Sequence, residues 1–210
     1  MRTSKLNLML SVIAVWGVTM LGAGPAAGFV CPEPITFHLS DDSGLVLDEI
    51  APPAGTANFK DSPALSRTAG NPWKDIGEWE GPDVDSETCS GVIGDFHAWL
   101  GLRNGDDQGT NFDLRAQVLL DDVVVATRIV QCIQGLTRNP ALADDIGPLS
   151  GFDGLIFGAG KISLRLAARI GTPKPPLIPT CGGHANATGL RVYYDSEARD
   201  SRFRVTFGPD

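Results

Sequence analysis

Residues 112–131 read FDLRAQVLL, then DD, then VVVATRIVQ. Both arms are rich in β-branched or alternating apolar residues, as strands are, and the pair Asp121-Asp122 between them suits a tight turn. The sequence therefore predicts an antiparallel hairpin, with strands at 112–120 and 123–131.

The same period of two recurs along the rest of the chain. Residues 162–170 alternate Ile, Leu and Ala with Ser, Arg and Ala, which indicates a strand with one buried and one solvated face. Glycine (25) and proline (15) are abundant, and only residues 139–146 hint at a short helix. We expect an all-β fold: a single antiparallel β-sandwich, jelly-roll or immunoglobulin-like, with about nine strands. Further strands are expected at 35–39, 45–50, 76–80, 94–103, 190–194 and 203–207.

The first residues have the features of a secretory signal peptide. Arg2 and Lys5 precede an apolar run at 8–21, and Ala26 and Gly28 supply the small residues that a signal peptidase requires. We expect a signal peptide at 1–28, a single domain at 29–210, and a secreted or periplasmic protein that is not inserted in the membrane after cleavage. A retained membrane anchor and a lipidated Cys31 are the alternatives.

The chain has four cysteines, and an even number in an exported protein favours disulfides over free thiols. Three pairings are possible. We favour Cys132 with Cys181 and Cys31 with Cys89, because Cys132 ends one strand pattern and Cys181 precedes another. A zinc site around Cys181 and His184 is the weaker alternative, since only one cysteine lies near that histidine.

Residues 51–72 lack any sustained period and are rich in Pro, Ala, Gly and Ser. We expect a long surface loop, or a cover over one sheet edge, at this place. The net charge of −8 repels phosphate backbones, so the sequence argues against nucleic-acid binding.

One loop gathers oxygen ligands at high density. It contains Asp106, Asp107, Asn111 and Asp113, which are the ligand types that calcium prefers. The alternative is that these side chains cap backbone amides within a tight connection, which needs no ion. The sequence thus leaves open a calcium site and a purely structural loop.

Several strings resemble a module found in uncharacterised secreted bacterial proteins. They are Asn71-Pro72-Trp73, the stretch from Trp99 to Thr110, the stretch from Cys132 to Pro140, and the stretch from Gly183 to Asp195. The resemblance covers roughly residues 70 to 207. It implies export and a β-rich fold, and it implies no activity.

The sequence contains no recognisable catalytic motif, so we assign no catalytic residue. The histidines are His38, His97 and His184, and no G-x-S-x-G motif is present. We expect an exported, non-enzymatic structural or binding module of the cell surface or extracellular space, with a glycan or a surface protein as its partner. The alternatives are a calcium-assisted carbohydrate-binding module and, third, a secreted hydrolase. Trp73, Trp79 and Trp99 are the aromatic residues that could face a sugar or belong to the core.

Overall fold

The computed structural model describes residues 31, 33–41, 44–84, 89–149, 152–154, 159–173 and 180–209. The predicted signal peptide at 1–28 lies outside these residues. The strands are β1 Ile35–Ser40, β2 Val46–Asp48, β3 Asn58–Asp61, β4 Leu65–Ser66, β5 Lys74–Val84, β6 Cys89–Leu102, β7 Phe112–Leu120, β8 Val123–Ile133, β9 Asp144–Leu149, β10 Asp153–Gly154, β11 Gly160–Ile170, β12 Asn186–Ala187, β13 Leu190–Tyr194 and β14 Arg202–Pro209. Short 3-10 helices lie between some of them: η1 Thr68–Gly70, η2 Gly105–Asp107, η3 Pro140–Leu142 and η4 Glu197–Arg199.

The all-β class is confirmed, but the sheet is larger than expected and it is mixed. Among the described residues, twelve strands form one sheet in the order β10-β8-β7-β11-β5-β2-β1-β14-β6-β13-β3, with β9 paired to β6, while β4 and β12 form a separate pair. Most neighbours are antiparallel, but β2 runs parallel to β5 where Val46 lies opposite Glu80. The expectation of one antiparallel sandwich of about nine strands therefore does not describe this sheet.

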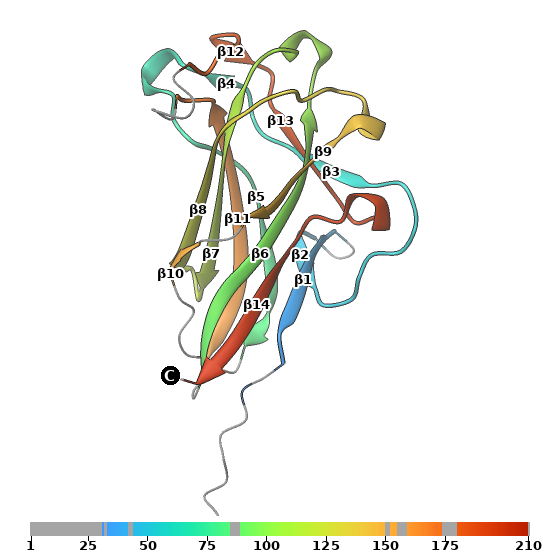
Figure 1. The fold of residues 1–210 in the computed structure, drawn as a ribbon, viewed down its shortest axis with the longest axis vertical. Helices are drawn as coiled ribbons and strands as arrows, with labels where there is room; N and C mark the ends of the chain where they lie inside the picture. The colour runs from blue at the N-terminus through green and yellow to red at the C-terminus, as the bar shows by residue number, and fades with distance from the viewer. Residues whose placement is uncertain are drawn as a thin grey trace, which may run out of the picture.

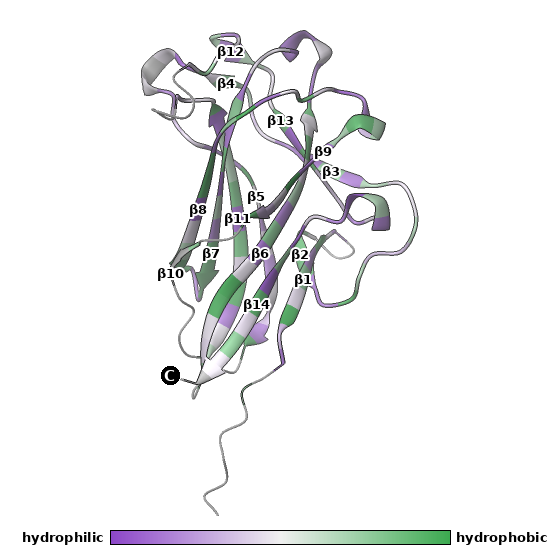
Figure 2. Ribbon diagram, in the orientation of Figure 1, coloured by the Kyte–Doolittle hydropathy of each residue, from purple (hydrophilic) through white to green (hydrophobic). Residues whose placement is uncertain are grey.

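The long sheet curls so that two of its parts face each other (Figure 1). One wall holds β5, β11, β7 and β8, and the other holds β1, β14 and β6. The Trp79 ring on β5 meets the Tyr194 ring on β13 edge to face at 5.5 Å, although these strands are not neighbours in the sheet. A single cluster of buried residues joins both walls, and Figure 2 shows hydrophobic and hydrophilic bands along β6 and β14.

The hairpin predicted at 112–131 is present. It is formed by β7 and β8, and Asp121 and Asp122 between them have φ values of 47° and 65°. Positive φ at both central residues is the geometry of a type I′ turn, whose twist matches that of the flanking strands. Leu114 and Val118 of β7 are fully buried in the core.

Two disulfides are present, in the pairing that the sequence favoured. Cys31 is joined to Cys89 at the start of β6, and Cys132 on β8 is joined to Cys181. Gly171 lies against the second bridge, because a Cβ at this position would come within 2.5 Å of the Cys181 sulfur. The bridge thus holds the end of β8 close to the end of β11.

Two local expectations need correction. Residues 51–72, expected to be a long surface loop or a cover over one sheet edge, contain the strands β3 and β4. These pair with β13 and β12 through backbone hydrogen bonds that no side-chain period reveals, and β3 is itself the last strand at one end of the sheet. The helix expected at 139–146 is one turn, η3, which is capped by Asn139, and the chain then enters β9. No helix among the described residues is long and apolar enough to cross a membrane.

Candidate binding site

The loop between β6 and β7 does not gather its oxygen ligands around one point. Asp107 is buried in η2, and its carboxylate accepts hydrogen bonds from the backbone amide and the hydroxyl of Thr188, with the shorter amide distance at 2.9 Å. Asp106 is exposed and accepts a bond of 3.1 Å from the side chain of Asn104. Asp107 therefore joins the loop to the segment before β13.

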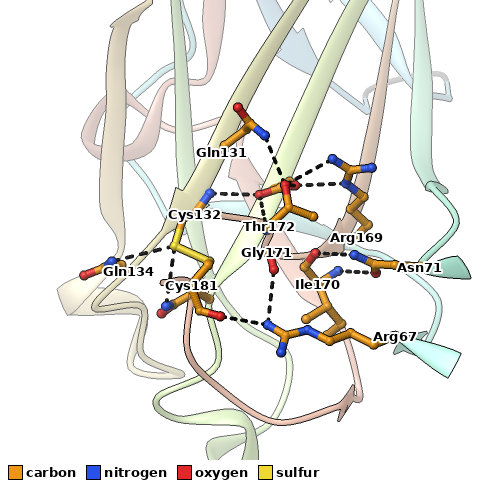
Figure 3. Close-up of a disulfide and its surroundings, with 12 residues drawn as sticks. Arg67, Asn71, Gln131, Cys132, Gln134, Arg169, Ile170, Gly171, Thr172 and Cys181 are labelled. Atoms are coloured by element: carbon orange, nitrogen blue, oxygen red, sulfur yellow. Dashed lines mark hydrogen bonds and ion pairs between the residues drawn. A yellow bond between two sulfur atoms is a disulfide. The ribbon is translucent and has the colours of Figure 1, made fainter. Parts of the chain in front are cut away.

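Asp113, at the start of β7, is fully buried, and its partners Cys132, Thr172 and Arg169 lie close together beside the disulfide (Figure 3). Its carboxylate accepts bonds from the Cys132 amide (2.8 Å), the Thr172 amide (3.0 Å) and the Thr172 hydroxyl (2.7 Å). It also pairs with Arg169 at 2.9 Å. The Asn111 side-chain nitrogen lies 3.7 Å from the Cys132 sulfur.

These contacts account for the carboxylates of Asp107 and Asp113 without an ion, which favours the structural interpretation of the loop. Among the described residues, no group of three or more His, Cys, Asp or Glu side chains is placed to hold a metal. The four residues considered for calcium are not brought together as one ligand set.

The buried histidine, His38, forms a structural pair. Its Nδ1 lies 2.7 Å from Asp200 Oδ1, and Arg202 binds the other oxygen of that carboxylate at 2.9 Å. This pair ties β1 to the start of β14. Ser40, two residues from His38, donates its hydroxyl to Asp195 instead of to the histidine. Within the described residues, no serine or threonine hydroxyl is hydrogen-bonded to a histidine ring, so no nucleophile and base are assembled there.

His97 and His184 are likewise not assembled into a site. The His97 ring lies 3.2 Å from a carboxylate oxygen of Asp145 on β9, and His184 is exposed. Of the three tryptophans considered as sugar platforms, Trp79 is fully buried in the core, whereas Trp73 and Trp99 are half-buried. Trp79 is thereby removed as a surface platform.

A pocket with aromatic lining lies partly on segment 51–72, which was expected to be a loop or an edge cover. It has a volume of about 410 Å³, within the usual range for ligand sites. Its walls come from segment 55–59, β13, η3 and η4. The lining residues are Gly55, Thr56, Ala57, Phe59, Pro140, Ala141, Arg191, Tyr193 and Arg199.

The pairing of β3 with β13 positions the two aromatic residues of this pocket. Phe59 lies opposite Tyr193, and Asp61 lies opposite Arg191, so all four side chains share one face of the two strands. The rings of Phe59 and Tyr193 meet edge to face at 6.3 Å, and the Arg191 guanidinium lies 3.6 Å from the centre of the Phe59 ring. The Phe59 side chain is still 49% exposed, so part of its ring remains available.

Two arginines supply the charge of the pocket. Arg191 is fixed by two hydrogen bonds to Asp61, of 2.7 and 2.9 Å. The pKa of Arg191 is raised above its ordinary value, first by those bonds and further by the Tyr193 hydroxyl, against a lowering effect of burial. Arg199, on η4, donates from Nε to the carbonyl oxygen of Pro140 at 2.6 Å. The lining side chains thus carry two positive charges and no negative one.

The proton of the Tyr193 hydroxyl has no acceptor. The residue is 2% exposed, and although its hydroxyl oxygen lies beside Arg191, no described residue accepts the hydroxyl proton. The ring lies across Gly101, where a Cβ would come within 2.8 Å of a ring carbon. A buried hydroxyl proton without an acceptor costs free energy, and such groups in native proteins call for an explanation.

Part of this site could be read from the sequence and part could not. The alternation at 190–194 places Arg191 and Tyr193 on one face of a strand. Nothing in the pattern shows that Phe59, on a strand far earlier in the chain, lies opposite Tyr193. The signal that could have found it is a lone phenylalanine between polar neighbours in a segment otherwise poor in aromatic residues.

Comparison with known proteins adds little about this site. No family model matches the chain, and no curated protein matches it. Two structures of a CocE/NonD family hydrolase from Staphylococcus aureus align with 83% and 84% of this chain, at 13% and 12% identity and TM-scores of 0.38 and 0.40. The chain spans 36% and 37% of those hydrolase chains. A structure of the infectious bursal disease virus Gt strain aligns with 81% of this chain and 41% of its own, at 15% identity and a TM-score of 0.30. Similarity at these TM-scores says nothing about function.

Proposed function

We propose that this protein is an exported, non-enzymatic binding module whose pocket beside β13 takes an acidic saccharide. The two disulfides support an extracellular or periplasmic location, because such bonds persist in oxidising compartments. The observation that carries the proposal is Tyr193, whose buried hydroxyl has no acceptor and whose side chain lines a pocket together with two arginines.

Each part of the pocket matches one part of such a ligand. The exposed portion of the Phe59 ring offers an apolar face against which the C–H face of a sugar ring can pack. Arg191 and Arg199 supply donors for a carboxylate, and charge-assisted bonds of this kind are stronger than neutral ones. The Tyr193 hydroxyl is closed to solvent in the free protein, so a sugar hydroxyl or ring oxygen can accept its proton only after neighbouring side chains shift. The new bond would then satisfy the hydroxyl proton that the free protein leaves without an acceptor.

The fixed geometry of the pocket favours binding. Arg191 is held by Asp61 and by the Phe59 ring, and Arg199 is held by the Pro140 carbonyl. Side chains that are already ordered lose little rotamer freedom when a ligand arrives, so less of the interaction energy is spent on ordering them. The Asp61 carboxylate offsets the charge of Arg191, so Arg199 supplies the positive charge that no carboxylate of the lining compensates.

The experiment is a calorimetric titration of the mature chain with D-glucuronate, D-glucose and benzoate. We expect saturable binding of glucuronate and binding of glucose weaker by at least about tenfold, because only the acid engages the arginines. Equal affinity for glucose would overturn the charge requirement. Benzoate binding as tight as glucuronate would overturn the saccharide assignment, and no binding of glucuronate to folded protein would overturn the proposal as a whole.

A further inference from the structure

A second cluster of cations lies on the other wall of the sheet, away from the pocket beside β13. On β11, Arg165 and Arg169 lie two residues to either side of Ala167, and Arg115 on β7 pairs directly with Ala167. Side chains two apart on a strand, and side chains directly opposite across a ladder, point to the same face. The three arginines therefore share the outer face of this wall.

Two of these arginines have carboxylate partners. Arg165 binds Glu78 on β5 at 2.7 and 2.9 Å, and Glu78 also accepts the hydroxyl of Ser163. Arg169 binds the buried carboxylate of Asp113 at 2.9 Å. Their charges are thus locally compensated.

Arg115 has no such partner. It is half-buried, its Nε atom is inaccessible to solvent, and its guanidinium donates no hydrogen bond to any residue that the structure describes. Its guanidinium lies 5.0 Å from the centre of the Trp73 ring, and that of Arg169 lies 4.4 Å from the same ring. The tryptophan therefore has two cations beside it.

The carboxylate of Asp75 also belongs to this face, because Asp75 on β5 pairs with Ala167 from the side opposite to Arg115. Asp75 is exposed, and it attracts the charge of Arg115 without a hydrogen bond between the two side chains. It therefore offsets part of the positive potential but leaves the donors of Arg115 free.

The electrostatics of Arg115 agree with this geometry. The pKa of Arg115 is lowered, first by burial and also by repulsion from Arg165 and Arg169, against the attraction of Asp75. A partly desolvated cation with free donors and cationic neighbours costs free energy that a bound anion would recover. A guanidinium presents its donors as a rigid fork, which matches two oxygens of a single oxyanion.

We infer that Arg115 anchors an oxyanion site on the outer face of β7 and β11, and that the site takes a doubly charged group such as sulfate or phosphate. The free Nη donors of Arg115 bind the anion, because Arg165 and Arg169 are already engaged by Glu78 and Asp113 and the Nε of Arg115 is closed to solvent. A doubly charged group gains more from the charge of Arg115, which no carboxylate hydrogen-bonds, than a singly charged carboxylate does.

This site is independent of the saccharide pocket. The pocket is formed by segment 55–59, β13, η3 and η4, whereas the oxyanion site is formed by β7, β11 and Trp73 just before β5. The two sites share no residue, so either can fail without affecting the other.

The test is a calorimetric titration of the mature chain with sodium sulfate and with sodium acetate, at constant ionic strength set with sodium chloride. Arg115→Gln removes the charge and the fork, and Arg138→Gln removes an exposed arginine elsewhere as the matched control. We expect saturable sulfate binding that is about tenfold tighter than acetate binding, unchanged in Arg138→Gln and weakened at least about tenfold in Arg115→Gln.

Arg115→Lys keeps the charge but loses the fork, so sulfate should bind it with intermediate affinity. Circular dichroism of each variant establishes whether it is folded. If Arg115→Gln does not fold, the sulfate affinity of Arg115→Lys tests the inference in its place. Equal sulfate affinity in the wild type and in a folded Arg115 variant would overturn the inference. So would acetate binding as tightly as sulfate, or no saturable sulfate binding by the wild type.

Discussion

The rings of Phe59 and Tyr193 meet edge to face across the β3–β13 ladder, with 6.3 Å between their centres. This contact joins a strand in the first third of the chain to one near its C-terminal end. Arg191 lies against the Phe59 ring and beside the Tyr193 hydroxyl, so one small ladder combines an apolar surface, a cation and a hydroxyl whose proton has no acceptor.

Phe59→Ala should weaken glucuronate binding by about tenfold, because it removes the apolar platform of the pocket. The half-exposed ring contributes little core packing, so the free energy of unfolding should fall by only about 1 kcal/mol. Calorimetry and urea denaturation measure the two effects. Val123→Ala, at a 64% exposed position, is the control and should bind like the wild type. Undiminished binding by Phe59→Ala would contradict the assigned role.

Asp113→Asn should lower the free energy of unfolding by about 3–5 kcal/mol, because the buried carboxylate pairs with Arg169 and accepts three further hydrogen bonds. Asp106→Asn changes an exposed carboxylate in the same region and should stay within about 0.5 kcal/mol of the wild type. Chemical denaturation of both variants measures the difference. Similar losses in the two would show that Asp113 has no special structural role.

The melting temperature of the mature chain should be the same in millimolar calcium chloride as in sodium chloride of equal ionic strength. The reason is that Asp107 and Asp113 are already engaged by Thr188, Thr172 and Arg169. A bound ion at a hundredfold excess over its dissociation constant would add about 2.7 kcal/mol, which a melting curve detects. A calcium-dependent rise that Asp106→Asn abolishes would restore the calcium interpretation of the loop.

Tyr194→Phe should remove part of the loss of stability at alkaline pH. Burial, together with the negative charges of Asp41 and Asp195 and a hydrogen bond to Asp41, raises the pKa of Tyr194 in the folded protein. A raised folded pKa means that the folded state binds more protons than the unfolded state above about pH 10, so this stabilising contribution is lost as pH rises beyond that point. Urea denaturation between pH 8 and 11 should show a shallower decline for the phenylalanine variant. Identical slopes would contradict the prediction.

The sequence predicted those elements whose side chains alternate, because alternation reports directly which face of a strand is buried. The hairpin of β7 and β8 and the strand β11 are of this kind. The strand β3 is different: its four residues are half-buried or exposed, so it has no buried apolar face, and its place is set by backbone bonds to β13. The parallel contact of β2 with β5 likewise depends on the path of the chain and leaves no local pattern.

The candidate site likewise combines features that the local sequence shows with features that only long-range contacts create. Counting oxygen ligands identified the loop from Asp106 to Asp113 as unusual, but their partners, Thr188 and Thr172, come from segments 81 and 59 residues away in sequence. The pocket residues Phe59, Arg191 and Tyr193 carry no motif, and only the ladder that joins them makes them a site. The disulfide pairing could be predicted because it needed only the ends of strands that were already recognised.

The most direct measurement of the central claim compares Tyr193→Phe with Tyr194→Phe. Both changes delete one hydroxyl, but of these two residues only Tyr193 lines the pocket. We predict that Tyr193→Phe binds D-glucuronate about three- to tenfold more weakly than the wild type, while the unliganded variant is at least as stable, because it loses a buried hydroxyl that had no acceptor. Tyr194→Phe should bind as the wild type does. Unchanged glucuronate affinity in a folded Tyr193→Phe protein would contradict the account.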